Sequence, residues 1–222
     1  MAEGEITYVA NVMEQHSVLP ENTRIRKIES ETGSTVFEIL QASVEADDRC
    51  QELPSEGSSF PPKSNPTVIR LVKGDHSTEL SQICSSLSSA LNYAANSRQE
   101  TFISQYIQSF STGDLEAYRD SQRTWVTDLT PRIENIFGFV EPYRDPSGVR
   151  AEFEGLVAIS NEEETKALTR LVEESDVFIR RLPWAMGAVE NNKKGPFEKA
   201  LFEPPDFTSI HGEMSQATSE PL

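Results

Sequence analysis

The sequence predicts an α+β fold that combines five short strands with several helices. Two observations support this prediction. Short runs rich in β-branched and aromatic residues are bounded by Gly, Pro, Asp and Ser, which is typical of strands and turns. In other stretches the apolar residues recur at spacings of three and four, which is typical of amphipathic helices.

The expected strands are the runs 23–30, 35–44, 67–73, 136–143 and 151–159. The first two are separated by a short turn at 31–34, which favours a hairpin. The last two are separated by 144–148, Arg-Asp-Pro-Ser-Gly. This is the stronger hairpin signal, because proline presets φ and glycine accepts a positive φ. The acids, serines and prolines of 45–66 predict a surface loop.

Helical spacing predicts an early helix at 5–16 and a group of three helices in the middle of the chain. The three are expected at 77–94, 102–113 and 115–125. A last helix is expected after Asn161, a good N-cap residue that is followed by three glutamates. Pro183 is expected to stop it.

Charge excludes two classes of partner. The 222 residues carry 36 acidic against 20 basic side chains, which gives a formal net charge of −16. Nucleic-acid binding needs clustered Lys and Arg, and an anionic membrane surface would repel this chain. We therefore expect neither nucleic acid nor a membrane as a partner. Hydrophobic residues make up only 36%, below the roughly 45–50% of globular chains, which predicts substantial loop or tail.

The N-terminal residues and the cysteines predict a cytoplasmic protein. Glu3 and Glu5 stand where a secretory signal would carry Lys or Arg, and no long apolar stretch follows them. Cys50 and Cys84 are interpreted as unpaired thiols rather than a disulfide.

The segment 136–159, IFGFVEPYRDPSGVRAEFEGLVAI, resembles the dipeptidyl peptidase III family of zinc exopeptidases. The stretch at 93–126 is similar to the helical part that precedes this hairpin in the family. RLPW at 181–184 and PDFTS at 205–209 match in the same order. The resemblance extends more loosely to 22–44, so that it covers nearly the whole chain.

The resemblance implies a particular architecture. Family enzymes have two lobes with a cleft between them, and this chain resembles most of the lower lobe. The implied fold is a small five-stranded, mostly antiparallel β-barrel or curled sheet packed with several α-helices. Residues 1–160 would form this lobe, 161–183 a helical arm that belongs to the upper lobe, and 184–222 an extended, partly disordered tail.

The resemblance also implies a substrate-facing site on the 136–159 hairpin. Glu141 would pair with the ammonium at a peptide N-terminus, and the Tyr143 hydroxyl would bind near the scissile carbonyl and support the oxyanion. Their i, i+2 spacing on a strand would put both side chains on one face. Trp125 and Arg144 are further substrate-binding candidates, although Arg144 is expected mainly to fix the turn. The alternative interpretation is that Tyr143 only packs and Glu141 is only solvated.

The sequence departs from the family at the metal site. Family enzymes hold zinc with the two histidines of a His-Glu-x-x-x-His helix and with a glutamate from a later helix. Catalysis by zinc requires such a set of ligands. This chain has only His16, His76 and His211, and none has a second histidine at helical spacing. The glutamates at 162–164 and 173–174 lack an accompanying histidine. We therefore expect no metal site and no cofactor in this chain, whereas the full-length family carries zinc.

Three functions remain open. The first is a truncated dipeptidyl peptidase III-like protein that keeps the substrate-facing hairpin but hydrolyses no peptide alone. The second is a stand-alone protein that binds or transforms a small molecule by proton transfer or cyclisation, with Glu141 as base and Tyr143 as acid. The third is an interaction module for a full-length homologue, which would use apolar cleft surface left exposed. The expected partners are accordingly a peptide or small molecule, or a full-length homologue.

Overall fold

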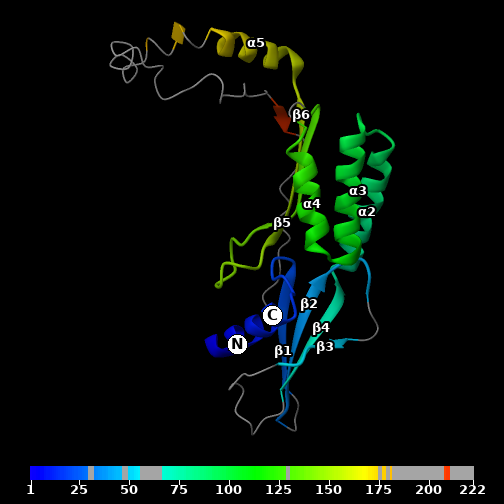
Figure 1. Cartoon of the computed structure of the whole chain (residues 1–222), viewed down its shortest axis with the longest axis vertical. Helices are drawn as coiled ribbons and strands as arrows, with labels where there is room; N and C mark the ends of the chain where they lie inside the picture. The colour runs from blue at the N-terminus through cyan, green and yellow to red at the C-terminus, as the bar shows by residue number, and fades with distance from the viewer. Residues whose placement is uncertain are drawn as a thin grey trace. The chain divides into compact units, whose positions relative to one another are not determined.

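Figure 1 shows the computed structural model of the chain, which describes residues 1–29, 33–46, 50–55, 67–128, 131–174, 177–178, 181 and 208–210. Its helices are α1 (Glu3–Gln15), α2 (Ser77–Leu91), α3 (Ser97–Thr112), α4 (Leu115–Trp125) and α5 (Glu162–Glu173). Its strands are β1 (Thr23–Glu29), β2 (Thr35–Ala42), β3 (Gln51–Glu52), β4 (Thr67–Asp75), β5 (Ile133–Glu141), β6 (Glu152–Ser160) and β7 (Thr208–Ile210). The fold is mixed α+β, as the sequence predicts.

The chain divides into two compact units. The first contains Met1–Leu129, Phe137–Glu154 and Ser215–Leu222, and the second contains Thr130–Ile136 and Gly155–Met214. The expected extended tail at 184–222 lies outside the described residues, apart from Thr208–Ile210. None of the described helices is both long enough and apolar enough to cross a membrane.

The first unit contains a four-stranded sheet in the order β1-β2-β4-β3. The predicted hairpin joins β1 and β2 in antiparallel register, with Ile25 opposite Ile39, while β2 and β4 run parallel. Helix α1 buries one apolar stripe against this sheet, as its helical spacing predicts. This core contains Tyr8, Val9, Val12, Met13, Phe37, Ile39, Leu53 and Ile69.

A second core of the first unit lies among α2, α3 and α4, which run side by side in Figure 1. Its buried residues are Ala42, Leu80, Leu87, Phe102, Ile103, Tyr106 and Phe110. Side chains from the sheet region satisfy the carbonyls at the end of α3. Asn22 donates to the Gly113 carbonyl at 3.0 Å and Lys73 to the Thr112 carbonyl at 3.3 Å. These bonds offset the orphan carbonyls of the helix C-terminus and attach the helices to the sheet.

The expected five-stranded barrel is wrong. Within the described residues, three predicted strands (β1, β2 and β4) belong to the four-stranded sheet, while β5 and β6 belong to a separate sheet with the order β5-β6-β7. The physical reason is packing: Phe137, Phe139 and Phe153 of β5 and β6 lie against the core of α2 and α3. The stretch 45–66 also differs from expectation, because Gln51–Glu52 forms the short strand β3 beside β4.

The second unit contains α5, β7 and the adjoining parts of β5 and β6. Strand β7 pairs antiparallel with β6, with Ala158 opposite Ile210. The predicted cap is confirmed, because the Asn161 side chain accepts a hydrogen bond from the Glu163 backbone N–H at 3.2 Å. Arg132 and Glu162 form an ion pair at 2.6 Å across this unit.

Candidate functional site

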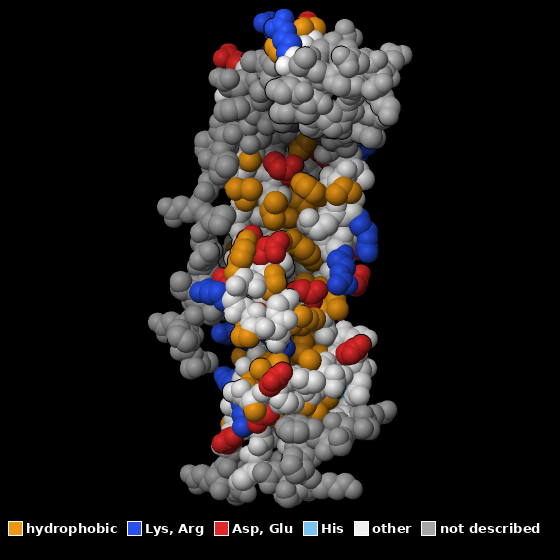
Figure 2. Space-filling view, turned by 90° about the vertical axis from the view of Figure 1, so that its left-hand side faces the viewer, with side chains coloured by type: hydrophobic (Ala, Val, Ile, Leu, Met, Phe, Trp, Pro, Cys, Tyr) orange, Lys and Arg blue, Asp and Glu red, His pale blue; other side chains and the backbone are white. Residues whose placement is uncertain are grey.

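The candidate site lies on the loop between β5 and β6, within the first unit. Glu141 is the last residue of β5, and Tyr143 follows two positions later, beyond the end of the strand. Both side chains are exposed, Tyr143 to 59%. The strand is shorter at this end than the sequence predicts, so the pleat alone does not decide where Tyr143 lies. Figure 2 shows apolar side chains with acidic ones among them on one face of the molecule.

Interaction with the carboxylate of Glu154 on β6 is the largest cause that raises the pKa of the Tyr143 phenol above its ordinary value. Partial desolvation and the charges of Glu154, Glu141 and Glu152 raise it further. The structure therefore brings Tyr143 and Glu141 together, and it adds two glutamates of β6 to them.

Arg144 forms an ion pair across the hairpin. Its Nε and Nη2 donate to the two carboxylate oxygens of Glu152, each at 2.6 Å. This forked pair lowers the pKa of Glu152 and raises the pKa of Arg144. Arg144 is thus engaged with Glu152.

Asp145 stabilises the turn between β5 and β6 by accepting backbone hydrogen bonds. Its Oδ2 accepts hydrogen bonds from the backbone N–H groups of Val149 and Arg150 at 2.9 and 3.1 Å. The Gly148 N–H donates to the Asp145 carbonyl at 2.9 Å, and Gly148 has a φ of 64°. Both roles follow from the turn chemistry of Asp and Gly. The loop is therefore held in place before any ligand arrives.

Tyr118 of α4 packs under the hairpin against Gly138 of β5. A Cβ at Gly138, whose φ is 150°, would lie 2.5 Å from the Tyr118 ring, so only glycine fits there. Burial is the main cause that raises the pKa of Tyr118, followed by its interactions with Tyr106 and Glu154. Glu154 is itself half-buried, and its Oε1 is buried with no hydrogen-bond partner.

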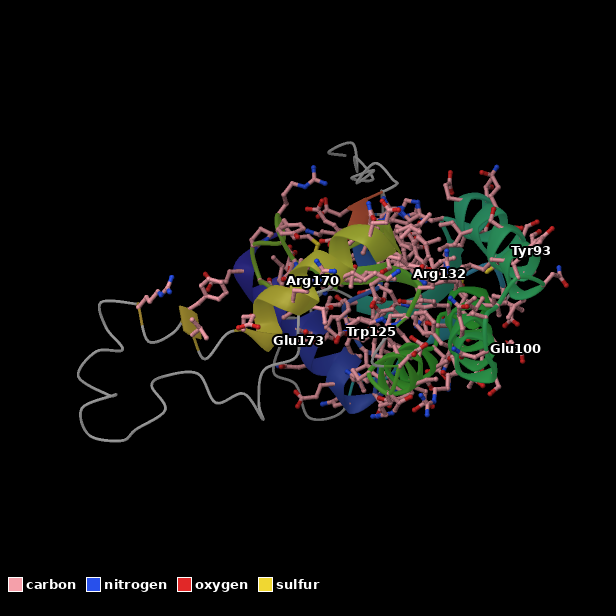
Figure 3. All side chains as sticks on the ribbon, turned by 90° about the horizontal axis from the view of Figure 1, so that it is seen from above. Tyr93, Glu100, Trp125, Arg132, Arg170 and Glu173 are labelled. Atoms are coloured by element: carbon pink, nitrogen blue, oxygen red, sulfur yellow. The ribbon has the colours of Figure 1, made fainter. Side chains whose placement is uncertain are left out.

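Trp125 occupies a different environment from the other predicted site residues. It ends α4 and packs, half-buried, against the core of α2 and α3. Figure 3 labels it near the middle of the view, whereas Tyr93 lies at the outer edge of the helices. Its role in ligand binding stays a prediction.

Sequence reasoning did not single out Glu154. A signal was present, because Glu152 and Glu154 alternate along β6 as Glu141 and Tyr143 do on the other side of the turn. The sequence does not show how β5 and β6 align across the turn, and this register decides which side chains of the two strands meet.

The described residues do not include a ligand set for a catalytic zinc. The described part of the chain contains no group of three or more His, Cys, Asp and Glu that could hold a metal ion. His16 donates from Nε2 to the Pro54 carbonyl at 2.8 Å, and His76 lies 3.8 Å from Asp75. His211 lies outside the described residues. Both cysteines are free, as predicted.

Comparison with known proteins identifies the family. The model of peptidase family M49 matches residues 1–219. Dipeptidyl peptidase 3 of Dictyostelium discoideum is 35% identical over 206 residues, which cover 93% of this chain and 27% of that protein. The Mus musculus protein of the same name is 36% identical over 191 residues, which cover 85% of this chain and 24% of that protein.

Among solved structures, dipeptidyl-peptidase III from Corallococcus sp. strain EGB matches with a TM-score of 0.46 and 19% identity, over 92% of this chain and 29% of that chain. The chain spans about a quarter of the length of the curated relatives it matches. The resemblance drawn from the hairpin sequence is confirmed, and the chain belongs to peptidase family M49.

Proposed function

We propose that this chain binds the amino end of a peptide at the β5–β6 loop. Glu141 would pair with the peptide ammonium, and Tyr143 would hydrogen-bond the peptide beside it. The proposal is supported by family membership and by the name of the relatives, dipeptidyl peptidase 3.

The observation that carries the proposal is a group of carboxylates that act on an exposed phenol. Glu141 and Glu154 both act on Tyr143, while the nearby cation Arg144 is engaged by Glu152. Such a site attracts a cation with N–H donors, and a peptide ammonium offers three of them.

We further propose that the chain does not hydrolyse peptides by itself. Hydrolysis by a zinc peptidase needs a ligand set that polarises the carbonyl and activates water, and the described residues do not supply one. We also propose a cytoplasmic location, on the ground that Cys50 and Cys84 are free thiols. We also propose that residues 161–183 form a helical arm.

Calorimetric titration with tetra-alanine and with N-acetyl-tetra-alanine tests the binding site. We expect binding of the free amine, loss of binding on acetylation, and a weakening of about tenfold or more in Glu141→Gln. Glu79→Gln, a change on α2, is the matched control and should bind like the wild type. Equal binding of the two peptides would refute the proposal.

A second assay tests the lack of hydrolysis. The chain is incubated with a dipeptidyl-arylamide and zinc, with and without a chelator. We expect no release of arylamine in either case. Turnover that the chelator abolishes would overturn this part of the proposal.

An interaction module for a full-length homologue is the second candidate. It is favoured by exposed apolar side chains on and beside the hairpin, Val140, Tyr143 and Val149. Size-exclusion chromatography with a full-length homologue tests it. A complex that forms equally well with Glu141→Gln would favour this candidate over peptide binding.

A further inference from the structure

Arg150 lies two positions before β6, and its side chain is half-buried. Its Nε is shielded from solvent and has no hydrogen-bond partner. Its Nη2 lies 3.7 Å from the sulfur of Met13, which is a weak acceptor. A guanidinium has five N–H donors and keeps its charge at neutral pH. The contacts that the described residues give to Arg150 therefore satisfy only a small part of its donors.

The other arginines of the chain are better compensated. Acidic residues outnumber basic ones by 36 to 20, so an arginine can readily find a carboxylate. Most arginines that the structure describes form ion pairs with carboxylates: Arg24, Arg26, Arg70, Arg119, Arg123, Arg132 and Arg144. Apart from Arg150, the described arginines that lack such a pair are exposed to water, namely Arg98, Arg170 and Arg181.

Two carboxylates near Arg150 are engaged elsewhere. Asp145 accepts the backbone N–H groups of Val149 and Arg150, and its charge opposes only in part the burial that lowers the pKa of Arg150. The Glu21 carbonyl accepts the N–H of Ala151, the next residue, at 2.9 Å, but the Glu21 carboxylate pairs with Arg119 at 3.5 Å. Taking a charge out of water without a partner is costly. The fold thus keeps a cation that the described residues do not neutralise by direct contact.

We propose that Arg150 anchors a binding site for a small carboxylate on the β6 side of the β5–β6 loop. The planar fork of a guanidinium matches the two oxygens of a carboxylate. One carboxylate neutralises the single positive charge. A doubly charged phosphate would add negative charge beside Asp145 and Glu21, so the site prefers the monoanion. The inference does not rest on the proposed function, because it concerns another residue and a ligand group of opposite charge.

Nuclear magnetic resonance of the arginine side chains tests this binding directly. The Nε–H signal of Arg150 is assigned by its absence from the spectrum of Arg150→Lys. Sodium acetate then replaces sodium chloride at constant ionic strength. We expect acetate to shift the Arg150 signal saturably, whereas uncharged acetamide at the same concentration should leave it in place. The absence of a saturable shift with acetate, or an equal shift with acetamide, would overturn the proposal.

Thermal unfolding tests whether the guanidinium is needed, because a ligand that binds the folded chain raises the midpoint of unfolding. Acetate in place of chloride should raise the midpoint of the wild type more than that of Arg150→Met. Arg98→Met is the matched control, since Arg98 is exposed and donates to the Thr127 carbonyl, and it should respond like the wild type. Equal responses of all three chains would indicate an adventitious ion only and would overturn the proposal.

A second variant keeps the test decisive if Arg150→Met does not fold. Arg150→Lys retains the charge but loses the planar fork, so it should bind acetate about tenfold more weakly than the wild type. Equal binding by Arg150→Lys would contradict the role of the fork. The titration of the wild-type chain does not depend on either variant being stable.

Two further ligands define the carboxylate. Phosphate should bind more weakly than acetate, and equal or tighter binding of phosphate would overturn the preference for a monoanion. N-acetylglycine resembles the carboxyl end of a peptide. Tighter binding of N-acetylglycine than of acetate supports a peptide end as the source of the carboxylate, and weaker binding supports a free small carboxylate. If tetra-alanine fails to bind while acetate shifts the Arg150 signal, the proposed function fails and this inference stands.

Discussion

Replacing Tyr106 with phenylalanine should destabilise the first unit through the loss of one oxygen atom. Tyr106 is 0% exposed, and its hydroxyl accepts hydrogen bonds from the Gln122 amide at 3.2 Å and from the Phe137 backbone N–H at 3.3 Å. The oxygen thus joins α3 to α4 and to β5. Phenylalanine keeps the ring and its stacking with Phe110, whose centroid lies 5.6 Å away. Any change in stability therefore reports the hydroxyl.

The magnitude follows from which donors lose their partner. The Gln122 amide also donates to Ser121 at 3.2 Å, so it keeps one acceptor. The Phe137 N–H loses the acceptor described for it, and a buried donor without a partner costs about 1–3 kcal/mol. We expect the free energy of unfolding to fall by about 1.5 kcal/mol, near the middle of that range.

Urea unfolding of wild type and variant, followed by circular dichroism, measures this loss. The matched control is Tyr93→Phe, because Tyr93 is 85% exposed and lies at the outer edge of the helices (Figure 3). We expect the control to change the free energy of unfolding by less than about 0.5 kcal/mol. Equal effects of the two variants would refute the assigned role of the buried hydroxyl.

Three further changes test the hairpin and the thiols. Gly138→Ala should lower the free energy of unfolding by about 2–4 kcal/mol in a urea titration, since its Cβ would lie 2.5 Å from the Tyr118 ring and its φ is 150°. Arg144→Gln should destabilise the chain near neutral pH but not in acid. Because Arg144 lowers the pKa of Glu152, this stabilisation is present above the unfolded pKa of about 4.3 and is lost as the pH falls through the lowered folded value. Cys84 should react slowly with a thiol-specific disulfide reagent, because burial raises its pKa.

The controls for these changes lie elsewhere in the first unit. Gly33→Ala places a Cβ in open space at a φ of 80°, so it should cost only the backbone strain, about 1–2 kcal/mol. A Gly138→Ala loss no larger than this would contradict the packing against Tyr118. Arg98→Gln serves as a surface control for the measurements against pH. A loss of unfolding free energy in Arg144→Gln that does not depend on pH would contradict the Arg144–Glu152 pair. Cys50 is exposed and should react first.

The sequence predicts the elements that depend on neighbouring residues. The stripe of apolar residues in α1, the Asn161 cap and the Asp-Pro-Ser-Gly turn are all local, and the structure confirms each of them. The family resemblance follows from a long ordered motif on one hairpin and its flanks, and it is also confirmed.

The predictions that failed depend on pairings between distant residues. The barrel was wrong because β5 and β6 pack their phenylalanines on the helical core instead of joining the first sheet. The parallel pairing of β2 with β4 also escaped prediction, since the strand residues alone do not encode the direction of a distant neighbour.

The candidate site shows the same division. The sequence by itself determined the turn, the identity of Glu141 and Tyr143 beside it, and the shortage of histidines for a zinc site. Only the tertiary structure decided that Arg144 pairs with Glu152 and that the glutamates of β6 raise the pKa of Tyr143. The physical reason is that side-chain partners across a hairpin depend on register and on the packing beneath it, here Tyr118 on Gly138. The sequence therefore indicates an acidic loop, and the fold decides that Arg144 pairs with Glu152.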